Sequence, residues 1–417
     1  MAVALVSTFD FGLQPVALAS AAAYLKHAGM ACTVFDFSQD EPSAERLVPF
    51  DFVVFHVPGF EGLAGTTALA RALRERSSAP SIGFVGTYAA INASTLLQKY
   101  ADWVILGSFE ESLVTLCQRI RSGESVSAIP GLLMQPGEVS PVRALSDWLL
   151  PDRTAVPSLV TYEYPAANRF LERRVVAANV ETTRGCRFEC AYCSIFAATQ
   201  AKIGVVPVST VLADIAQVER AGAEHICFSD AEFLNAPKHA LAIVQEMHDR
   251  FPKLTFDFTS RIDLIGADLN RLQEFVRCGA RWVTSAFEFP KRQVLEIFNK
   301  GFGPKQLDAT LSMTRQTGLH VNPTFVLFNP WVSVNDIEGA LRFIEERELD
   351  VEDVQFTTRL WLYKGSPLLE NWDVQASIVR EHEFHYEWRH RDGRVEELFS
   401  SMEARYGSAA GRCCLKC

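Results

Sequence analysis

Short β-rich runs alternate with amphipathic helical stretches along most of this chain, and this alternation limits the fold more than any other feature. The first series ends near residue 122, with helices expected near residues 15–28 and 63–74. Strands are expected at residues 3–7, 32–36, 51–55, 81–85 and 102–106. Strands that alternate with helices favour a parallel sheet. We therefore expect a Rossmann-like domain at residues 1–122.

A second alternating series follows a stretch rich in Pro, Gly and Ser at residues 123–174, which we interpret as a linker. Helical stretches are expected at residues 209–221, 237–250 and 307–317. Strands are expected at residues 175–179, 225–228, 254–258, 282–285, 321–325 and 354–357. These units predict a partial (β/α)6 barrel at residues 175–379, with its active face at the carboxyl ends of the strands. Residues 380–417 then form a C-terminal region that ends in a cysteine-rich tail.

Composition narrows the classes of partner. The chain of 417 residues is 48% hydrophobic and carries a formal net charge of −10, so it has no broad basic face for nucleic acid. No apolar run reaches the roughly 18–20 residues that span a bilayer, and the N-terminus lacks the basic region of a secretory signal. We therefore expect a cytoplasmic protein that acts without nucleic acid or membrane.

The strongest local signal is Cys186-Arg-Phe-Glu-Cys190-Ala-Tyr-Cys193, which follows the first expected barrel strand. Ten cysteines in a reducing compartment, gathered mainly into two clusters, indicate metal or thiolate chemistry rather than disulfides. Three thiolates on one loop can hold three corners of a 4Fe-4S cubane and leave the fourth iron open to a substrate. A zinc site with a fourth protein ligand and a group of buried structural cysteines are the alternatives.

This motif at the opening of a β/α barrel resembles the radical S-adenosylmethionine (SAM) superfamily over residues of about 175–370. The resemblance implies that Cys186, Cys190 and Cys193 bind the cluster, that SAM binds the open iron, and that Tyr192 lies near the adenine. Glu232, in Ser229-Asp-Ala-Glu232, occupies the place of the family's methionine-binding segment but departs from its Gly-Gly-Glu form. Arg261 and Glu288 stand where family members contact the carboxylate and ribose of SAM. Each of these residues taken alone is as often a surface or salt-bridged residue.

The first domain is similar to the cobalamin-binding domain that precedes many such barrels, and the likeness includes residues 101–110. The Asp-x-His-x-x-Gly signature of that family, which supplies a lower histidine ligand, is absent. Asp10 is followed by Phe11 and Gly12, and the pair His56 and Gly59 has Val54 where the acid would stand. We therefore prefer a scaffold role for this domain, with cobalamin binding as the alternative.

The chain ends in Arg412-Cys413-Cys414-Leu-Lys416-Cys417, which is the second strong signal. Three thiols near a chain end can converge on one soft atom, and arsenic(III) takes three sulfur ligands in a pyramid. Arg412 and Lys416 would lower the pKa values of the thiols. A redox dithiol, a zinc site and an auxiliary iron–sulfur cluster are the alternatives.

A radical SAM barrel with this tail resembles the family of radical SAM enzymes that serves arsinothricin biosynthesis. The resemblance implies that SAM is cleaved between sulfur and the γ-carbon, giving methylthioadenosine and a 3-amino-3-carboxypropyl radical. That radical would attack arsenic(III) held by Cys413, Cys414 and Cys417 and form a carbon–arsenic bond. The partners implied are arsenite, SAM and a reductant such as flavodoxin or ferredoxin.

Two other functions remain open. A conventional member of the superfamily would make a 5′-deoxyadenosyl radical and, with cobalamin, methylate an organic or peptide substrate. A non-enzymatic sensor would use the tail alone to bind arsenic or zinc. His382, His385 and His390 are candidate metal ligands or proton donors, with a solvated polar segment as the alternative.

Overall fold

A computed structural model of the chain describes residues 2–76, 79–142 and 145–408. The contacts within the chain divide it into two compact units. Unit 1 comprises residues 1–184 and 202–227, and unit 2 comprises residues 185–201 and 228–417. The loop that carries the first cysteine cluster therefore belongs to unit 2, together with most of the barrel-like region.

Unit 1 contains a six-stranded sheet within the described residues, in the order β2-β1-β3-β4-β5-β6. Its strands are β1 (Ala2–Ser7), β2 (Ala31–Asp36), β3 (Phe52–His56), β4 (Ser81–Val85), β5 (Trp103–Ile105) and β6 (Leu132–Leu133). The first five are parallel, as the sequence predicts, and the Rossmann-like architecture is confirmed. The short β6 pairs antiparallel with β5 and lies inside the stretch that we interpret as linker.

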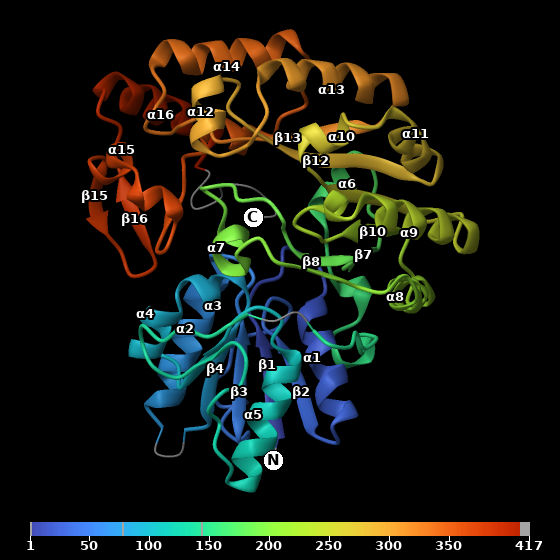
Figure 1. The fold of residues 1–417 in the computed structure, drawn as a ribbon, viewed down its shortest axis with the longest axis vertical. Coiled ribbons are helices and arrows are strands. Elements are labelled where there is room, and N and C mark those ends of the chain that lie inside the picture. The colour runs from blue at the N-terminus through green and yellow to red at the C-terminus, as the bar shows by residue number, and fades with distance from the viewer. Residues whose placement is uncertain (1, 77–78, 143–144, 409–417) are drawn as a thin grey trace. The chain divides into compact units, whose positions relative to one another are not determined.

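Helices pack on this sheet through an apolar core (Figure 1). They are α1 (Val16–His27), α2 (Glu61–Arg74), α3 (Thr87–Ile91), α4 (Ala93–Lys99) and α5 (Glu110–Ser122). Leu18 and Leu25 of α1 and Leu113 of α5 belong to the same buried cluster as residues of β1, β3 and β5. Gly83 of β4 is required there, because a Cβ atom would lie 2.1 Å from the ring of Trp103.

The stretch expected to be a linker contains short helices rather than continuous coil. They are η1 (Arg153–Ala155), η2 (Leu159–Thr161) and α6 (Pro165–Phe170), and Pro165 stands at the first turn of α6, where its missing N–H costs no hydrogen bond. Arg153 is buried and its guanidinium bonds both carboxylate oxygens of Asp214 in α8 (Val208–Arg220), at 2.9 and 2.6 Å. This segment is therefore packed into unit 1.

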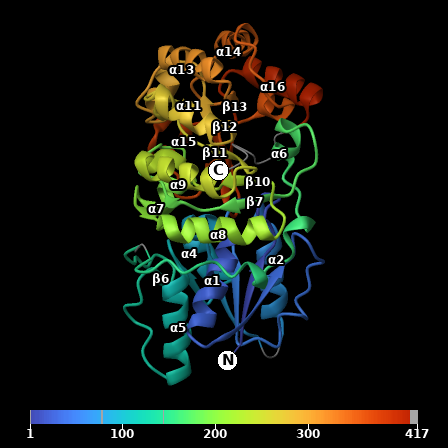
Figure 2. The same ribbon diagram turned by 90° about the vertical axis from the view of Figure 1, so that its right-hand side faces the viewer.

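The second sheet has the strand order β13-β12-β11-β10-β7, so strands that follow one another in the sequence are neighbours. Its strands are β7 (Ala177–Val180), β10 (His225–Phe228), β11 (Thr255–Thr259), β12 (Ala280–Glu288) and β13 (His320–Phe325). The pairs β11–β12 and β12–β13 are parallel, and the boundary between the two units falls inside β10. The helices of this region are α9 (Pro237–Arg250), α10 (Ile262–Ile265), α11 (Leu269–Arg277), α12 (Arg292–Ile297), α13 (Pro304–Thr317) and α14 (Val334–Glu346). Figure 2 shows α9, α11, α13 and α14 from a second side.

The prediction of a sixth barrel strand at residues 354–357 is wrong. The segment is a 3-10 helix, η4 (Asp353–Thr357). Among the described residues, an isolated parallel bridge between Phe328 and Arg359 follows it in place of a sixth strand of this sheet. Side chains of Gln355 and Thr358 make the hydrogen bonds to β13 that the backbone of a sixth strand would make. The N–H of Phe325 donates to Oε1 of Gln355 at 2.9 Å, and Oγ1 of Thr358 donates to the carbonyl of Phe325 at 2.7 Å. These side chains satisfy the backbone N–H and carbonyl of Phe325 at the edge of β13. The segment therefore does not have to be extended to pair with that edge.

Phenylalanine rings form the centre of unit 2. Neighbouring ring centroids in this group are 4.6 to 6.2 Å apart, in stacked, tilted and edge-on arrangements. Its members are Phe228, Phe233, Phe256, Phe258 and Phe275. Aromatic contacts of this kind stabilise a core beyond the area that they bury, so the ends of β10 and β11 have a rigid base.

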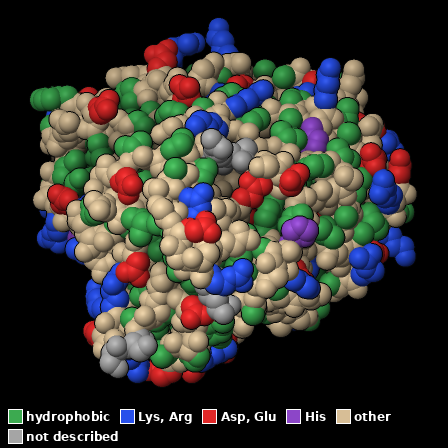
Figure 3. All heavy atoms as spheres, turned by 60° about the horizontal axis from the view of Figure 1, so that its bottom comes forward, with side chains coloured by type: hydrophobic (Ala, Val, Ile, Leu, Met, Phe, Trp, Pro, Cys, Tyr) green, Lys and Arg blue, Asp and Glu red, His purple; other side chains and the backbone are tan. Residues whose placement is uncertain are grey.

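The C-terminal part of unit 2 holds a small sheet in the order β14-β16-β15 and a closing helix. Its elements are β14 (Leu362–Tyr363), η5 (Pro367–Glu370), α15 (Trp372–Gln375), β15 (Ile378–Glu381), β16 (His385–Trp388) and α16 (Gly393–Tyr406). Among the described residues, no helix is both long and apolar enough to cross a bilayer. Figure 3 shows basic and acidic side chains interspersed over the face that it draws, in keeping with the mixed charge of the sequence.

Candidate active site

Three cysteines lie on one loop between β8 (Thr183–Gly185) and α7 (Ser194–Thr199). Cys190 is buried, whereas Cys186 and Cys193 are partly buried. Asn235 holds the start of the loop: its amide donates to the carbonyl of Gly185 at 3.0 Å, and its side-chain oxygen accepts from the N–H of Arg187 at 3.2 Å. The three thiols are therefore presented together by a loop with fixed backbone partners.

The thiols of this loop influence each other's ionisation. Burial, together with the charges of Glu232, Cys193 and Cys190, raises the pKa of Cys186 to about 12. Burial also raises the pKa of Cys193 to about 11, with a contribution from Cys190. Thiols must lose their protons to bind iron, so we expect cluster assembly to release protons.

Glu232 is buried at the turn after β10 and accepts three hydrogen bonds. Oε1 accepts from Oγ of Ser260 at 2.6 Å and from the N–H of Leu234 at 2.8 Å, and Oε2 accepts from the N–H of Arg261 at 2.8 Å. Burial raises the pKa of Glu232 above its usual value, although these hydrogen bonds oppose the rise. The carboxylate therefore joins the turn after β10 to the turn after β11.

Tyr192, Glu288 and Lys300 form a connected polar group. The phenol of Tyr192 donates to Oε1 of Glu288, and Nζ of Lys300 lies 3.0 Å from the same oxygen and 3.2 Å from the phenol oxygen. Glu288 ends β12 with a φ of 60°, next to an irregularity in the register with β13. A left-handed backbone is costly for glutamate, and such bulges commonly redirect a side chain near an active site.

Arg261 follows β11 and directs its guanidinium at the cysteine loop. Nη1 lies 3.5 Å from Sγ of Cys190, and Nε and Nη2 each lie 3.0 Å from an oxygen of Asp263. Nη2 also donates to the carbonyl of Lys300, and the guanidinium stacks 4.1 Å from the ring centroid of Phe188. The structure thus brings Arg261 to a predicted cluster ligand and Glu288 to Tyr192.

The donor set on this loop suits an iron–sulfur cluster. Within the described ranges, no three His, Cys, Asp or Glu side chains are arranged to hold a single metal ion. In a cubane cluster each thiolate binds a different iron atom, so three cysteines on one loop can bind three of the irons. An N–H donor at one of the sulfurs is a second feature of such sites.

The model of the radical SAM superfamily matches residues 180–344, which include the cysteine loop and β10 to β13. This stretch is a radical SAM domain. Domains of this superfamily use a 4Fe-4S cluster and SAM.

A curated relative and two solved structures are similar to this chain. A curated relative, an uncharacterized methyltransferase of Pyrococcus horikoshii, is 24% identical over 291 residues that cover 66% of this chain and 61% of the relative. The methyltransferase TsrM from Kitasatospora setae has a TM-score of 0.72 and 16% identity, with 90% of this chain and 76% of that chain covered. The cobalamin-dependent radical SAM enzyme OxsB has a TM-score of 0.76 and 14% identity, with 96% of this chain and 66% of that chain covered. The chain spans about three fifths of the curated relative.

Cobalamin is bound in structures of both TsrM and OxsB, so the carboxyl edge of the unit 1 sheet is the place to test for it. A Cβ added to Gly12 would lie 2.3 Å from the carbonyl oxygen of Glu163, and one added to Gly86 would lie 2.8 Å from that of Val57. Backbone atoms of this chain therefore fill the space beside Gly12 and Gly86. His56 is buried beside Asp10, with Nδ1 at 3.9 Å from a carboxylate oxygen. Cobalamin binding at this edge stays a prediction.

The remaining predicted residues lie elsewhere. Cys413, Cys414 and Cys417 lie outside the described residues. His382 and His385 stack with their ring centroids 4.4 Å apart, and Nε2 of His382 lies 3.2 Å from Glu387. A cavity of about 550 Å³ adjoins His385, whereas Nε2 of His390 is buried without a hydrogen-bond partner. Their roles as metal ligands or proton donors stay predictions.

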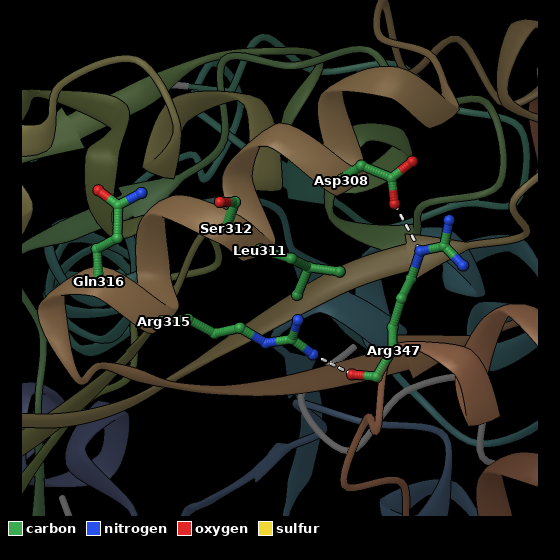
Figure 4. A pocket seen from close by; sticks show the side chains of 6 residues that line it. All are labelled: Asp308, Leu311, Ser312, Arg315, Gln316 and Arg347. Atoms are coloured by element: carbon green, nitrogen blue, oxygen red, sulfur yellow. Dashed lines mark hydrogen bonds and ion pairs between the residues drawn. The ribbon is translucent and has the colours of Figure 1, made fainter.

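A separate cavity of about 380 Å³ lies against α13 (Figure 4). Figure 4 shows Asp308 and Arg347 reaching toward each other, and Nε of Arg347 lies 2.5 Å from Oδ1 of Asp308. Arg315 donates to the carbonyl of Arg347. This cavity is lined by none of the predicted site residues.

Sequence reasoning missed two residues of the site. Asn235 holds the cysteine loop, and Lys300 joins Glu288 to Tyr192. Lys300 stands in the run Asn299-Lys-Gly-Phe-Gly303, where a lone lysine among turn residues reads as a surface charge. Only the burial of Lys300 in the folded chain distinguishes it from a surface lysine.

Proposed function

We propose that Cys186, Cys190 and Cys193 bind a 4Fe-4S cluster, and that the chain transfers a carbon fragment of SAM to an acceptor. The observation that carries this proposal is the arrangement of the cysteine loop against Arg261 and the group formed by Tyr192, Glu288 and Lys300. The cluster, when bound, supplies the electron that cleaves a carbon–sulfur bond of SAM.

The chain's own residues prepare the site for this chemistry. Arg261 donates a hydrogen bond to the sulfur of Cys190, and Phe188 covers the face of the guanidinium. Tyr192 packs on Phe298 with ring centroids 4.7 Å apart, beside its bond to Glu288. We infer that Tyr192 and Glu288 contact the adenosine part of SAM and that Glu232 and Arg261 support its methionine part. A radical reacts with whatever lies nearest, so burial and fixed position supply the selectivity.

Methyl transfer to an organic or peptide acceptor is the candidate that the similar proteins favour. The curated relative is named as a methyltransferase, and TsrM is a radical SAM methyltransferase whose structure holds tryptophan as substrate. In OxsB the same fold binds cobalamin and SAM. A methyltransferase of this type would carry a corrinoid, as the structures of TsrM and OxsB do.

Transfer of a 3-amino-3-carboxypropyl group to arsenic(III) is the second candidate. The specific observation in its favour is the tail with Cys413, Cys414 and Cys417, three soft donors within five positions. One electron would cleave the bond between sulfur and the γ-carbon and release methylthioadenosine. The carbon radical would then form a carbon–arsenic bond as one arsenic–sulfur bond breaks and releases a thiyl radical. A second electron from the flavodoxin- or ferredoxin-type reductant would return that thiyl radical to thiolate and leave an arsinothricin-type product.

One anaerobic assay separates these candidates. The reconstituted, reduced full chain is incubated with SAM, with and without arsenite, and methylthioadenosine, 5′-deoxyadenosine, S-adenosylhomocysteine and organoarsenicals are resolved by mass. Methylthioadenosine with a new organoarsenical supports aminocarboxypropyl transfer, provided that both vanish in the triple variant Cys413→Ser, Cys414→Ser, Cys417→Ser and persist in Cys32→Ser. Bound corrinoid, with S-adenosylhomocysteine or 5′-deoxyadenosine and no effect of arsenite, supports methyl transfer.

The cluster itself is tested by iron analysis. Cys186→Ala, Cys190→Ala and Cys193→Ala should each lose most of the cluster's absorbance near 410 nm and its iron. Cys117→Ala, at a buried cysteine of unit 1, should keep both. Full iron content in the three loop variants would contradict the proposal.

A further inference from the structure

Lys300 is a buried cation beside the cysteine loop. Its side chain is 2% exposed, and Nζ lies 3.0 Å from Glu288 and 3.2 Å from the phenol of Tyr192, two positions after Cys190. Burial opposes the charged ammonium, but the charges of Glu288 and Cys190 outweigh it and raise the pKa of Lys300 above its usual value. Lys300 is thus buried in an ion pair with Glu288 beside the cysteine loop.

Arg261 is a second cation beside the cysteine loop, and it contacts the sulfur of Cys190 directly. Its guanidinium is held on three sides, by Asp263, by the carbonyl of Lys300 and by the ring of Phe188. The remaining nitrogen, Nη1, lies 3.5 Å from Sγ of Cys190. A guanidinium fixed in this way has little freedom to turn away, so its N–H stays directed at the sulfur.

The two cations lie against the same loop. Arg261 donates to the sulfur of Cys190, and Lys300 donates to the phenol of Tyr192, so both can stabilise negative charge on the cysteine loop. Glu288 opposes Lys300, because its carboxylate lies against the same ammonium.

A structural role alone explains this arrangement poorly. A buried ion pair is weak support for stability, since well-packed apolar residues of similar size often do as well. The informative feature is the position of the two cations next to a predicted cluster ligand. Hydrogen bonds to the sulfurs and nearby charge are among the factors that set the potential of an iron–sulfur cluster.

We propose that Arg261 and Lys300 raise the reduction potential of the cluster at its Cys190 corner and that Glu288 moderates this effect. Reduction adds one negative charge to the cluster, which a nearby cation and an N–H donor stabilise more than the oxidised state. The cluster then accepts an electron from a weaker reductant than it would without these residues. This inference rests on the proposed function, because it requires Cys190 to ligate the cluster.

The test is a redox titration followed by electron paramagnetic resonance, on the reconstituted full chain without SAM. At a fixed solution potential, Lys300→Met and Arg261→Gln should each lower the ratio of reduced to oxidised cluster about tenfold, equivalent to about 59 mV for one electron. Lys291→Met is the matched control: it removes a cation of the same unit that is paired with Asp336 at 2.8 Å and is partly exposed. It should leave the ratio unchanged.

A double variant separates charge from packing. Lys300→Met with Glu288→Gln removes one positive and one negative charge, so most of the shift seen in Lys300→Met should be reversed. A potential equal to that of the wild type in both Lys300→Met and Arg261→Gln would overturn the inference. A double variant as shifted as Lys300→Met would also overturn it, because packing rather than charge would then be responsible.

Iron content distinguishes failure of this inference from failure of the proposed function. The variants are compared only when their iron content equals that of the wild type. If Lys300→Met and Arg261→Gln bind less iron, Lys300→Gln and Arg261→Lys are measured in their place. Lys300→Gln should show the same lowered ratio, while Arg261→Lys, which keeps the charge, should retain part of the wild-type ratio. A wild-type chain that binds no cluster would overturn the proposed function and this inference together, whereas a loaded cluster with unshifted potentials overturns this inference alone.

Discussion

Oε2 of Glu232 accepts a hydrogen bond from the backbone N–H of Arg261 at 2.8 Å, across the ends of two strands of the radical SAM domain. The other oxygen of the same buried carboxylate accepts from Ser260 and Leu234. Glu232 thereby fixes the backbone from which Arg261 reaches the sulfur of Cys190. A residue predicted to bind the methionine part of SAM is thus also a link between two turns of the site.

Replacing Glu232 by Gln should destabilise unit 2. The amide has one accepting oxygen in place of two, so at least one of the three donors loses its buried partner at a cost of about 2 kcal/mol. Thermal unfolding of Glu232→Gln should show a lower midpoint than the wild type. Glu246→Gln, at a partly exposed glutamate paired with Arg250, is the control and should unfold like the wild type. Equal midpoints for both variants would show that the network contributes no stability.

Replacing Arg153 by Met should destabilise unit 1 by about 3–5 kcal/mol, because Asp214 would keep a buried charge without its partner. The two side chains are 7% and 5% exposed. The measurement is urea-induced unfolding followed by circular dichroism. Lys26→Met removes an exposed cation paired with Asp152 at 3.0 Å, and it should cost less than about 1 kcal/mol. The prediction fails if the two variants unfold at the same urea concentration.

His56 should make unit 1 less stable at acid pH. Burial, and next the charge of Arg184, lower the pKa of His56 to about 3, whereas an unfolded histidine titrates near pH 6.5. Between these values the unfolded chain binds a proton that the folded chain does not, so stability falls as the pH drops from about 6.5 toward 3. The facing Asp10, whose pKa burial raises well above its usual value, acts in the opposite direction.

The variant His56→Phe isolates the histidine contribution. It should reduce the loss of stability on acidification by up to about 1.4 kcal/mol per pH unit between pH 6 and 4, since Asp10 is left in place. Urea unfolding of the variant and the wild type at pH 7 and pH 5 measures this difference. The exposed His27 provides the control, because His27→Gln should keep the pH dependence of the wild type. An unchanged dependence in His56→Phe would refute the assignment.

Replacing Gln355 by Met should weaken the edge of β13. The N–H of Phe325 would lose its buried acceptor, at a cost of about 1–3 kcal/mol. Thermal unfolding should show a lower midpoint, with Gln316→Met at an exposed position of α13 as the control. A midpoint equal to that of the control would mean that another acceptor replaces Gln355.

The sequence predicted most of the framework because burial leaves a periodic trace. Val3 to Val6 of β1 and Phe52 to Phe55 of β3 are wholly or almost wholly buried, as their unbroken apolar runs indicate for a parallel sheet. The same reasoning failed at residues 354–357. Their β-branched and aromatic residues favour a strand, but Gln355 and Thr358 bond the edge of β13 through their side chains, which no periodic pattern reveals.

The sequence alone predicted the chemistry of the cysteine loop, because three soft donors within eight residues can be brought together by a single loop. The surroundings of that loop were decided only by the tertiary structure. Glu232, Arg261, Glu288 and Lys300 come from turns far apart in the chain, and their contacts depend on strand order and on the irregular end of β12. A local pattern encodes which groups a segment carries. The pairing of charges across a site depends on long-range packing, and for Lys300 that packing turned an ordinary lysine into a buried cation.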